Sequence, residues 1–520
     1  MTETEPQHME KQLRIVLPSL MLAMLLAMLD NMIVGTAMPR IVGELGGLAH
    51  LSWVVTAYIL GTTVSTPIWG KLGDLYGRKG IFLGSIVLFL IGSALSGMSQ
   101  DMVQLIGFRA VQGLGAGGLV VGVMAIIGDL VPPRERGQYQ GMLAGIMAIA
   151  MVGGPLIGGF ITDHLSWRWA FYVNLPLGGL ALLILMTQLH LPKYRTEHRI
   201  DWLGAGLMAV GITAIVLVTT WGGTQYAWRS AQIIGLSVLA VLALAAFAVV
   251  ERRAAEPVLS LKLFTNRNFA LVSGIGFVVG FALFGAVTFL PLYQQTVQGA
   301  SATNSGLLLL PLMAGLLVTS VVVGRAITKT GRYKVFPIVG GVLMVVGMLL
   351  LAQLSFDTSK TASALYMVVL GLGMGCLMQT TILIAQNSVE PRDLGVASSG
   401  ATFFRSIGGS FGVSLFGAIF ANRLTHEVAA RLGPEAASRL SGRGGGGGRL
   451  DPATLKLLPA PVRDGFLHGV AYAISGVFVW SVLFAIVVPI LASFIKEIPL
   501  RGRPDTAQVV KEDSTLVSVD

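Results

Sequence analysis

The stretch LRIVLPSLMLAMLLAMLDNMIVGTAMP, from Leu13 to Pro39, is long and apolar enough to cross a lipid bilayer as one helix. It contains a single carboxylate, Asp30, which is followed by Asn31. Because removing a charge from water at membrane depth is costly, acids in such segments face a cavity, bind a ligand or exchange a proton. Asp30 is therefore the first candidate functional residue.

The composition of the whole chain is that of an integral membrane protein. Of 520 residues, 54% are hydrophobic and 12% are charged, and the mean hydropathy is +0.75. The single cysteine, Cys376, excludes a disulfide framework and a cysteine metal cluster. The first twelve residues carry three acids. We therefore expect a retained first membrane helix rather than a cleaved signal peptide.

Apolar segments of spanning length recur along the chain. We place about 14 of them at 13–39, 51–69, 81–99, 102–127, 138–162, 169–190, 202–221, 231–250, 269–292, 304–323, 334–354, 362–385, 394–420 and 468–495. Every second connection is basic, and the others are nearly free of Lys and Arg. The positive-inside rule then puts both termini in the cytoplasm. The net charge of +10 is explained as a topology signal, so no nucleic-acid partner is expected.

One connection departs from this pattern. The stretch 421–467 is long, carries seven basic residues and a run of glycines, and falls on the outer side. Long loops cross the membrane regardless of their charge. We expect its first part to continue the preceding helix and the rest to act as a spacer, with a substrate-handling role left open.

An internal repeat indicates two related halves. The segment GKLGDLYGRK, Gly70 to Lys79, returns in degraded form as GRAITKTGRYK, Gly324 to Lys334. Repeated membrane halves with a substrate site between them are the usual architecture of secondary transporters. Asp74 is replaced by Thr328 in the second copy, so the two segments are not equivalent gates.

Several motifs in order resemble one family. They are LDNMIVGTAMP in the first segment, GKLGDLYGRKG between the second and third, RAVQGLGAGG in the fourth, GGPLIGG in the fifth, WRWAFYVNLPLG in the sixth, and FLPLYQQTVQGASATNSGLLLLP later in the chain. Over nearly all the helical region the sequence resembles a major facilitator superfamily transporter of the 14-helix drug:proton antiporter branch.

The resemblance implies an all-α integral membrane protein with the major facilitator fold. Two six-helix bundles, 13–190 and 269–495, would flank two inserted helices at 202–250, with cytoplasmic tails at 1–12 and 496–520. We expect no enzyme activity and no metal site. No GxxxxGK[ST] phosphate loop occurs, and all seven histidines fall in loops or at segment ends.

The loop motif predicts a conformational gate. Gly70 and Gly77 permit a tight turn and close helix approach, and Asp74 can pair with Arg78 or lie at a helix N-terminus, where an anion is favoured. A merely basic cytoplasmic turn is the alternative, but it leaves the lone acid among three cations unexplained.

Arg109 lies within the fourth segment and shares a helix face with Gly113 and Gly117. An unpaired guanidinium at that depth is costly, so we expect it to face the interior and to use Gln112, backbone carbonyls or Asp30 as partners. The family resemblance implies a role in proton coupling. A purely structural, hydrogen-bonding arginine remains the alternative.

The fifth segment carries the motif that the resemblance ties to export-type antiporters, formed by Gly154, Pro155, Gly158 and Gly159. Pro155 is expected to kink the helix, and the small residues allow close packing, which is also the plain alternative. RSIGGSFG, from Arg405 to Gly412, is a candidate counterpart in the other half. Arg405 either faces the cavity or lies near a helix end and snorkels.

The predicted function is proton-coupled efflux of lipophilic drugs or antibiotics by alternating access, with Asp30 as the proton switch and Arg109 as its partner. Candidate cavity residues are Asn31, Tyr58, Gln112 and Arg405. We expect a monomer in the cell membrane that uses the proton gradient, binds lipophilic small molecules and needs no cofactor. Export of lipids or glycolipids is the alternative, and nutrient import by the same fold is a weaker one.

Overall fold

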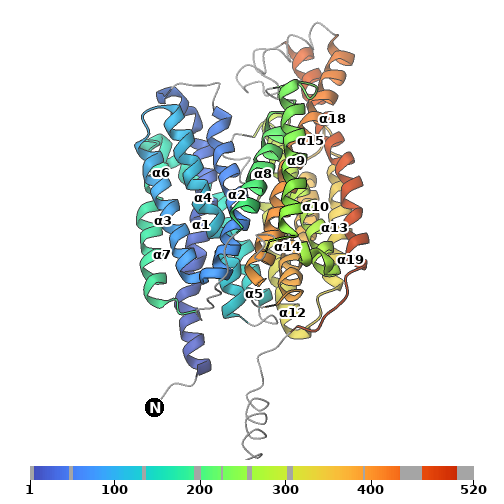
Figure 1. Cartoon of the computed structure of the whole chain (residues 1–520). Coiled ribbons are helices and arrows are strands. Elements are labelled where there is room, and N and C mark those ends of the chain that lie inside the picture. Colours follow the sequence, from blue (N-terminus) through green and yellow to red (C-terminus); the bar gives the residue numbers. More distant parts are fainter. Residues whose placement is uncertain are drawn as a thin grey trace, which may run out of the picture.

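The computed structural model describes residues 5–45, 51–131, 136–191, 201–223, 226–254, 261–300, 308–390, 393–433 and 459–500. These residues form helices, with an isolated bridge between Gly222 and Tyr226 as their one strand-like pairing. In Figure 1 the helices run roughly parallel to one another, as expected for a chain of apolar segments that cross a bilayer.

The helices of the first part of the chain are α1 (Glu5–Leu45), α2 (Leu51–Tyr76), α3 (Arg78–Met98), α4 (Met102–Leu130), α5 (Arg136–His164), α6 (Trp169–Tyr172) and α7 (Asn174–Gln188). They are followed by α8 (Trp202–Trp221) and α9 (Ala231–Glu251). The second part holds η2 (Leu261–Thr265), α10 (Arg267–Thr296), α12 (Leu310–Thr330), α13 (Val335–Leu351), α14 (Lys360–Asn387), α15 (Leu394–Leu432), α18 (Ala460–Ala485) and α19 (Val487–Ser493).

Each predicted apolar segment overlaps one of these helices or a consecutive pair, α6 with α7 or α18 with α19. Within the described ranges, 11 helical stretches are long and apolar enough to cross a membrane. The helix α13 is apolar but shorter, and α2 and α5 fall outside the set. The helix α2 falls outside because TTVSTP replaces aliphatic residues by small and polar ones, and many side chains of α5 lie outside the described residues.

Local capping explains where many helices begin and end. Side chains accept hydrogen bonds from the first free N–H groups of α4, α8, α9, α10 and α14, and these caps are Asp101, Asp201, Ser230, Asn266 and Ser359. Gly331 ends α12 with φ 69°, and Gly77 separates α2 from α3 with φ 94°. Both are backbone conformations that glycine adopts without strain.

The helices gather in two groups. Figure 1 shows α1, α3, α4, α6 and α7 on the left and α10, α13, α15, α18 and α19 on the right. Two buried hydrophobic clusters lie within α1–α7, apart from Ile382 of α14. A larger cluster is built from α10 to α19. We call the end at which α1 begins the inner end, which the charge pattern predicts to be cytoplasmic, and the opposite end the outer end.

A fourth hydrophobic cluster lies at the seam between the two groups. It joins Val64 of α2, Met208 of α8, Phe247 of α9 and Phe403 of α15. The helix α8 packs against both α2 and α15. The pair α8 and α9 is therefore attached where the two groups meet, and α9 packs chiefly on α8.

The residues that follow α19 form a strap, 496–498, across the inner end of the second group. The side-chain amide of Asn268 in α10 bonds both backbone groups of Lys496, with Nδ2 to O at 2.7 Å and N to Oδ1 at 2.9 Å. Ile498 N donates to the Tyr333 hydroxyl at 2.7 Å, and Asn387 Nδ2 donates to Ile498 O at 3.3 Å. Burial raises the pKa of Tyr333, which keeps this hydroxyl neutral. The strap thus ties the inner ends of α10, α13 and α14 together.

Candidate functional site

Asp30 lies at the centre of a buried polar cluster in the first group of helices. Its side chain is 0% exposed and forms an ion pair with Nη1 of Arg109, which is also 0% exposed. Gln112 Nε2 donates to Asp30 Oδ1 at 2.8 Å, and Asn174 Nδ2 donates to the same oxygen at 2.9 Å. The carboxylate therefore has the partners that burial of a charge requires.

Arg109 is held by α2 as well as by α1. Its Nη1 also donates to Gln112 Oε1 at 2.9 Å, and its Nε donates to Val54 O at 3.4 Å. The guanidinium carbon lies 4.1 Å from the centre of the Tyr58 ring, a cation–π contact. The Tyr58 hydroxyl donates to Ala27 O at 2.7 Å. The expected partners of Arg109, namely Gln112, a backbone carbonyl and Asp30, are all present.

Two members of the cluster were not predicted from the sequence. Ser93 of α3 accepts from Gln112 Nε2 at 3.1 Å and from Asn174 Nδ2 at 2.9 Å, and it donates to Phe171 O at 2.9 Å. Asn174 opens α7 inside the motif WRWAFYVNLPLG. An asparagine at the start of an apolar helix is a signal that could have pointed to Asn174, whereas Ser93, one of three serines in α3, carries none.

The cluster is incompletely satisfied. Arg109 Nη2 and Asn174 Oδ1 are buried without a hydrogen-bond partner in the described structure. Each unpaired buried polar atom costs about 1–3 kcal/mol. The cluster thus joins α1, α2, α3, α4 and α7 through charged and polar contacts, while two of its polar atoms have no partner among the described residues.

A second polar site lies at the inner end, where the two groups of helices meet. Asp74, in the last turns of α2, accepts from the backbone N–H groups of Gly395 at 3.2 Å and Val396 at 2.9 Å, the first residues of α15. A carboxylate at a helix N-terminus is favoured by the unpaired N–H groups and the helix dipole. Gly70 permits this approach, since a Cβ there would lie 2.7 Å from Ser399 Oγ.

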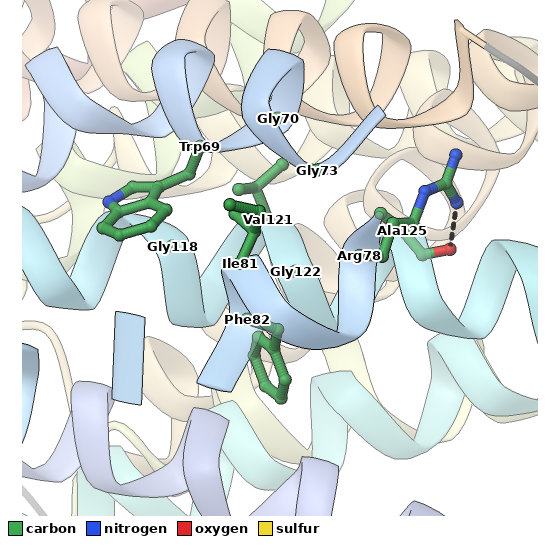
Figure 2. Close-up of a pocket in the computed structure, with 10 residues that line it drawn as sticks. All are labelled: Trp69, Gly70, Gly73, Arg78, Ile81, Phe82, Gly118, Val121, Gly122 and Ala125. Carbon is green, nitrogen blue, oxygen red and sulfur yellow. Dashed lines mark hydrogen bonds between the residues drawn. The ribbon is translucent and has the colours of Figure 1, made fainter. Parts of the chain in front are cut away.

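Arg78, in the first turn of α3, holds Asp74 from the other side. Its Nη2 lies 2.9 Å from Asp74 Oδ1, and its Nη1 lies 2.6 Å from Asp129 Oδ1. Nη1 also donates to Ala125 O of α4 at 2.8 Å, the dashed line in Figure 2. Figure 2 shows Arg78 at the edge of a small pocket between α2, α3 and α4, which Gly73 and Phe82 also line. The predicted pair is present, and Asp129 is an added partner.

We expect Asp74→Asn to loosen the inner end. The amide loses the ion pair with Arg78 and the charge-assisted bonds to α15, which are worth about 1.5–3 kcal/mol each. The ratio of molecules in which α2 and α15 are in contact at the inner end to molecules in which they are apart should fall about tenfold or more. Pulsed electron–electron spin distances between labels at Tyr76 and at the inner end of α15 measure this ratio.

Lys79→Gln is the matched control. It removes a charge from the same turn, but Lys79 donates to Met186 O and not to α15. It should leave the distances unchanged. If Asp74→Asn gives the same distance distribution as the unaltered protein, the gate interpretation is wrong.

A further contact between the groups lies close to this gate. Gln386 Nε2 of α14 donates to Met124 O of α4 at 3.2 Å and to Ser398 Oγ of α15 at 2.9 Å. Together with the bonds from α15 to Asp74, it crosses between the two groups at their inner halves. In this structure the two groups are therefore joined at the inner end.

The antiporter-type motif lies in α5, which is helical throughout from Arg136 to His164. Gly154 and Gly158 are buried, and a Cβ at Gly154 would overlap the side chain of Met32 in α1. Gly159 is only partly buried. The expected close packing is therefore seen between α5 and α1. The side chain of Pro155 lies outside the described residues, so its expected kink stays a prediction.

The four candidate cavity residues lie in two settings. Tyr58, 5% exposed, and Gln112, 0% exposed, are members of the polar cluster. Asn31 is partly buried, and its Oδ1 has no partner among the described residues. Arg405 is partly buried in α15. Contact with a substrate stays a prediction for all four.

At the outer end, a partly exposed link ties α1 to the two residues that precede α6. Trp167 Nε1 donates to Glu44 Oε2 at 2.8 Å, and Arg168 pairs with the same carboxylate and donates to Ser99 O at 3.2 Å. The hydrogen bonds from Arg168 and Trp167 lower the pKa of Glu44 below its ordinary value. The contribution of this link to stability is therefore present above the ordinary pKa of glutamate and is lost as the pH falls through the lowered one.

Comparisons with known proteins agree with this geometry. The sequence model of the Major Facilitator Superfamily matches residues 20–413. An uncharacterized MFS-type transporter of Mycobacterium tuberculosis is 43% identical over 493 residues, which cover 95% of this chain and 71% of that protein. The multidrug transporter protein MdtP of Bacillus subtilis is 41% identical over 420 residues, covering 81% of this chain and 77% of MdtP.

Solved structures give the same fold. The proton:xylose symporter XylE superposes with a TM-score of 0.58 at 15% identity, over 94% of this chain and 97% of that one. At this identity the likeness concerns the fold alone. Transporters of this kind handle small-molecule substrates in the membrane. The chain belongs to the Major Facilitator Superfamily and is a multi-pass membrane protein of transporter rather than enzyme type.

Proposed function

We propose that this protein exports lipophilic drugs from the cell by proton-coupled antiport in the cell membrane, acting as a monomer without a bound cofactor. One observation carries the proposal, the ion pair of Asp30 and Arg109 buried at 0% exposure inside the first group of helices. Intramembrane charges of this kind mark ion or proton pathways. The 41% identity to a protein named a multidrug transporter supports the substrate class.

The proposed cycle begins with a proton from the outside. Protonation of Asp30 removes the charge that pairs with Arg109, and the bonds from Gln112 and Asn174 then face a neutral acid. The contacts between α1, α4 and α7 weaken as a result. Release of the proton to the cytoplasm restores the pair, so proton uptake and release would bias two arrangements of the same helices.

The helix α4 connects this cluster to the gate. Arg109 and Ala125 lie sixteen positions apart on α4, about 24 Å along its axis. The inner part of α4 supplies Ala125 O and Asp129 to Arg78, which in turn holds Asp74 against α15. A shift of α4 on protonation would therefore reach the inner contact between the two groups. This provides a physical route for alternating access.

Transport into inside-out vesicles tests the proposal. We expect a pH gradient to drive uptake of lipophilic compounds, and we expect nigericin, which collapses the gradient, to stop it. The test compounds are all about the size of quinoline and differ in charge. One is neutral, N-methylquinolinium is a permanent cation, and naphthalene sulfonate is a permanent anion. Vesicles from cells without the protein are the control. Absence of gradient-driven uptake for every test compound would contradict drug export.

The alternative substrate class, lipids or glycolipids, has one observation in its favour. The helix α15 has 39 residues, about 58 Å, against a hydrocarbon layer of about 30 Å. Its outer turns continue beyond that layer, and Leu424 and Val428 there belong to the same buried hydrophobic cluster as Phe466 of α18. Gradient-driven movement of a fluorescent glycolipid, with no movement of the test compounds, would support this alternative.

A further inference from the structure

Arg405 lies at mid-depth in the second group of helices. Arg405 follows Leu394, the first residue of α15, by eleven positions. It therefore lies about 16 Å along the helix axis from the inner end of α15. The hydrocarbon layer is about 30 Å thick. An arginine side chain in the middle of such a layer cannot extend to either surface, so snorkelling does not account for it.

The guanidinium of Arg405 has no partner among the described residues. No described residue forms an ion pair or hydrogen bond with it, in contrast to Arg109 and Arg78. Its backbone packs against Gly280 of α10, and its side chain is partly buried. A partly accessible guanidinium at this depth, without a partner among the described residues, is open to contact with a bound molecule. Its five N–H donors are thus available to such a molecule.

A second unpaired polar group lies next to it on the helix. Thr402 is 6% exposed, and its Oγ1 has no hydrogen-bond partner among the described residues. It precedes Arg405 by three positions, so the two side chains share one face of α15. Close packing of α10 at Gly280 against the backbone of Arg405 holds this part of α15 in place. The Arg405 guanidinium and the Thr402 hydroxyl therefore lie on one face of a helix that α10 holds in place.

The other mid-depth charges do not neutralise this face. Asp30 and Arg109 are both 0% exposed and pair with each other within the first group of helices. Among the described residues at this depth, the accessible charge is the positive one on Arg405. A site with a positive, hydrogen-bonding wall favours an anion over a cation of the same shape.

We propose that Arg405 and Thr402 form a substrate subsite that binds the acidic group, carboxylate or sulfonate, of lipophilic anions. The inference rests on the proposed export function and specifies its substrate class. Arg405 binds the anionic oxygens with charge-assisted hydrogen bonds, and the Thr402 hydroxyl donates to a second oxygen. The apolar remainder of the substrate needs only hydrophobic surface.

Paired probes of one shape and opposite charge test the subsite. Naphthalene sulfonate and N-methylquinolinium are compared by gradient-driven uptake into vesicles and by equilibrium dialysis against the purified protein. We expect Arg405→Gln to weaken binding and uptake of naphthalene sulfonate about tenfold or more. Arg405→Lys should retain part of the affinity, because it keeps the charge but loses the planar donor fork. Uptake of N-methylquinolinium should be unchanged or higher in both variants.

Arg423→Gln is the matched control, since Arg423 lies on the same helix nearer its outer end, 5.6 Å from the Tyr472 ring. It should leave both probes unaffected. Equal affinity of the unaltered protein and Arg405→Gln for naphthalene sulfonate would overturn the subsite, even where N-methylquinolinium is exported and the proposed function holds. If no compound is exported, the proposed function is contradicted instead. Equilibrium dialysis then still tests the subsite, because it measures binding of naphthalene sulfonate without transport.

Discussion

Asp30→Asn should abolish transport driven by the proton gradient, lowering the initial rate by about 100-fold or more, while substrate binding stays within about threefold. Asparagine keeps the shape of the side chain and accepts the bonds from Gln112 and Asn174, but it cannot take up and release a proton. The variant therefore resembles the protonated arrangement permanently. Uptake into inside-out vesicles at matched protein levels, with binding measured in parallel, tests this expectation.

Asp101→Asn is the appropriate control for that experiment. Asp101 caps α4, the helix that carries Arg109, and asparagine serves equally well as an N-cap. Its rate should match that of the unaltered protein. Retention of gradient-driven transport in Asp30→Asn would remove Asp30 from the coupling mechanism, whatever its structural role.

Arg109→Met should destabilise the protein by about 3–5 kcal/mol, because it leaves the buried carboxylate of Asp30 without its cation. Combining it with Asp30→Asn removes both charges. The double variant should therefore be more stable than the sum of the two single effects predicts. Thermal unfolding of the four proteins in one detergent gives the coupling between the two side chains.

The double variant should nevertheless fail to transport, because it has no group that carries a proton. This separates stability from coupling. Additive effects of the two substitutions on the unfolding temperature would show that the pair is not energetically linked, and would favour the alternative of an independent structural arginine.

The sequence predicted the charged parts of the site because charges in apolar segments are costly. Asp30 and Arg109 each needed a partner, and they proved to be partners of each other. The same reasoning could not find Ser93 or Asn174, since neutral polar side chains in a helix are tolerated at low cost and occur at many positions. Their place in the cluster follows from how α3 and α7 pack, which the sequence does not state.

Helix positions were predicted better than helix ends. The first predicted segment ends at Pro39, where the apolar run ends, whereas α1 continues to Leu45. The contacts of Glu44 with Trp167 and Arg168 stabilise these last turns. Likewise α2 extends past 69 to Tyr76, because Asp74 is bonded by α3 and α15. Tertiary contacts set these ends, and they lie far apart in the sequence.

The strap has a consequence for the design of split and rearranged chains. One amide, that of Asn268, bonds the backbone of Lys496, so the second group of helices begins and ends at the same point in space. Adjacent ends are what circular permutation and fragment complementation require. A chain cut between α9 and α10 keeps this closure within its second fragment, whereas a chain cut between α15 and α18 separates Lys496 from Asn268. The first break should be repaired by co-expression of the two fragments, and the second should not.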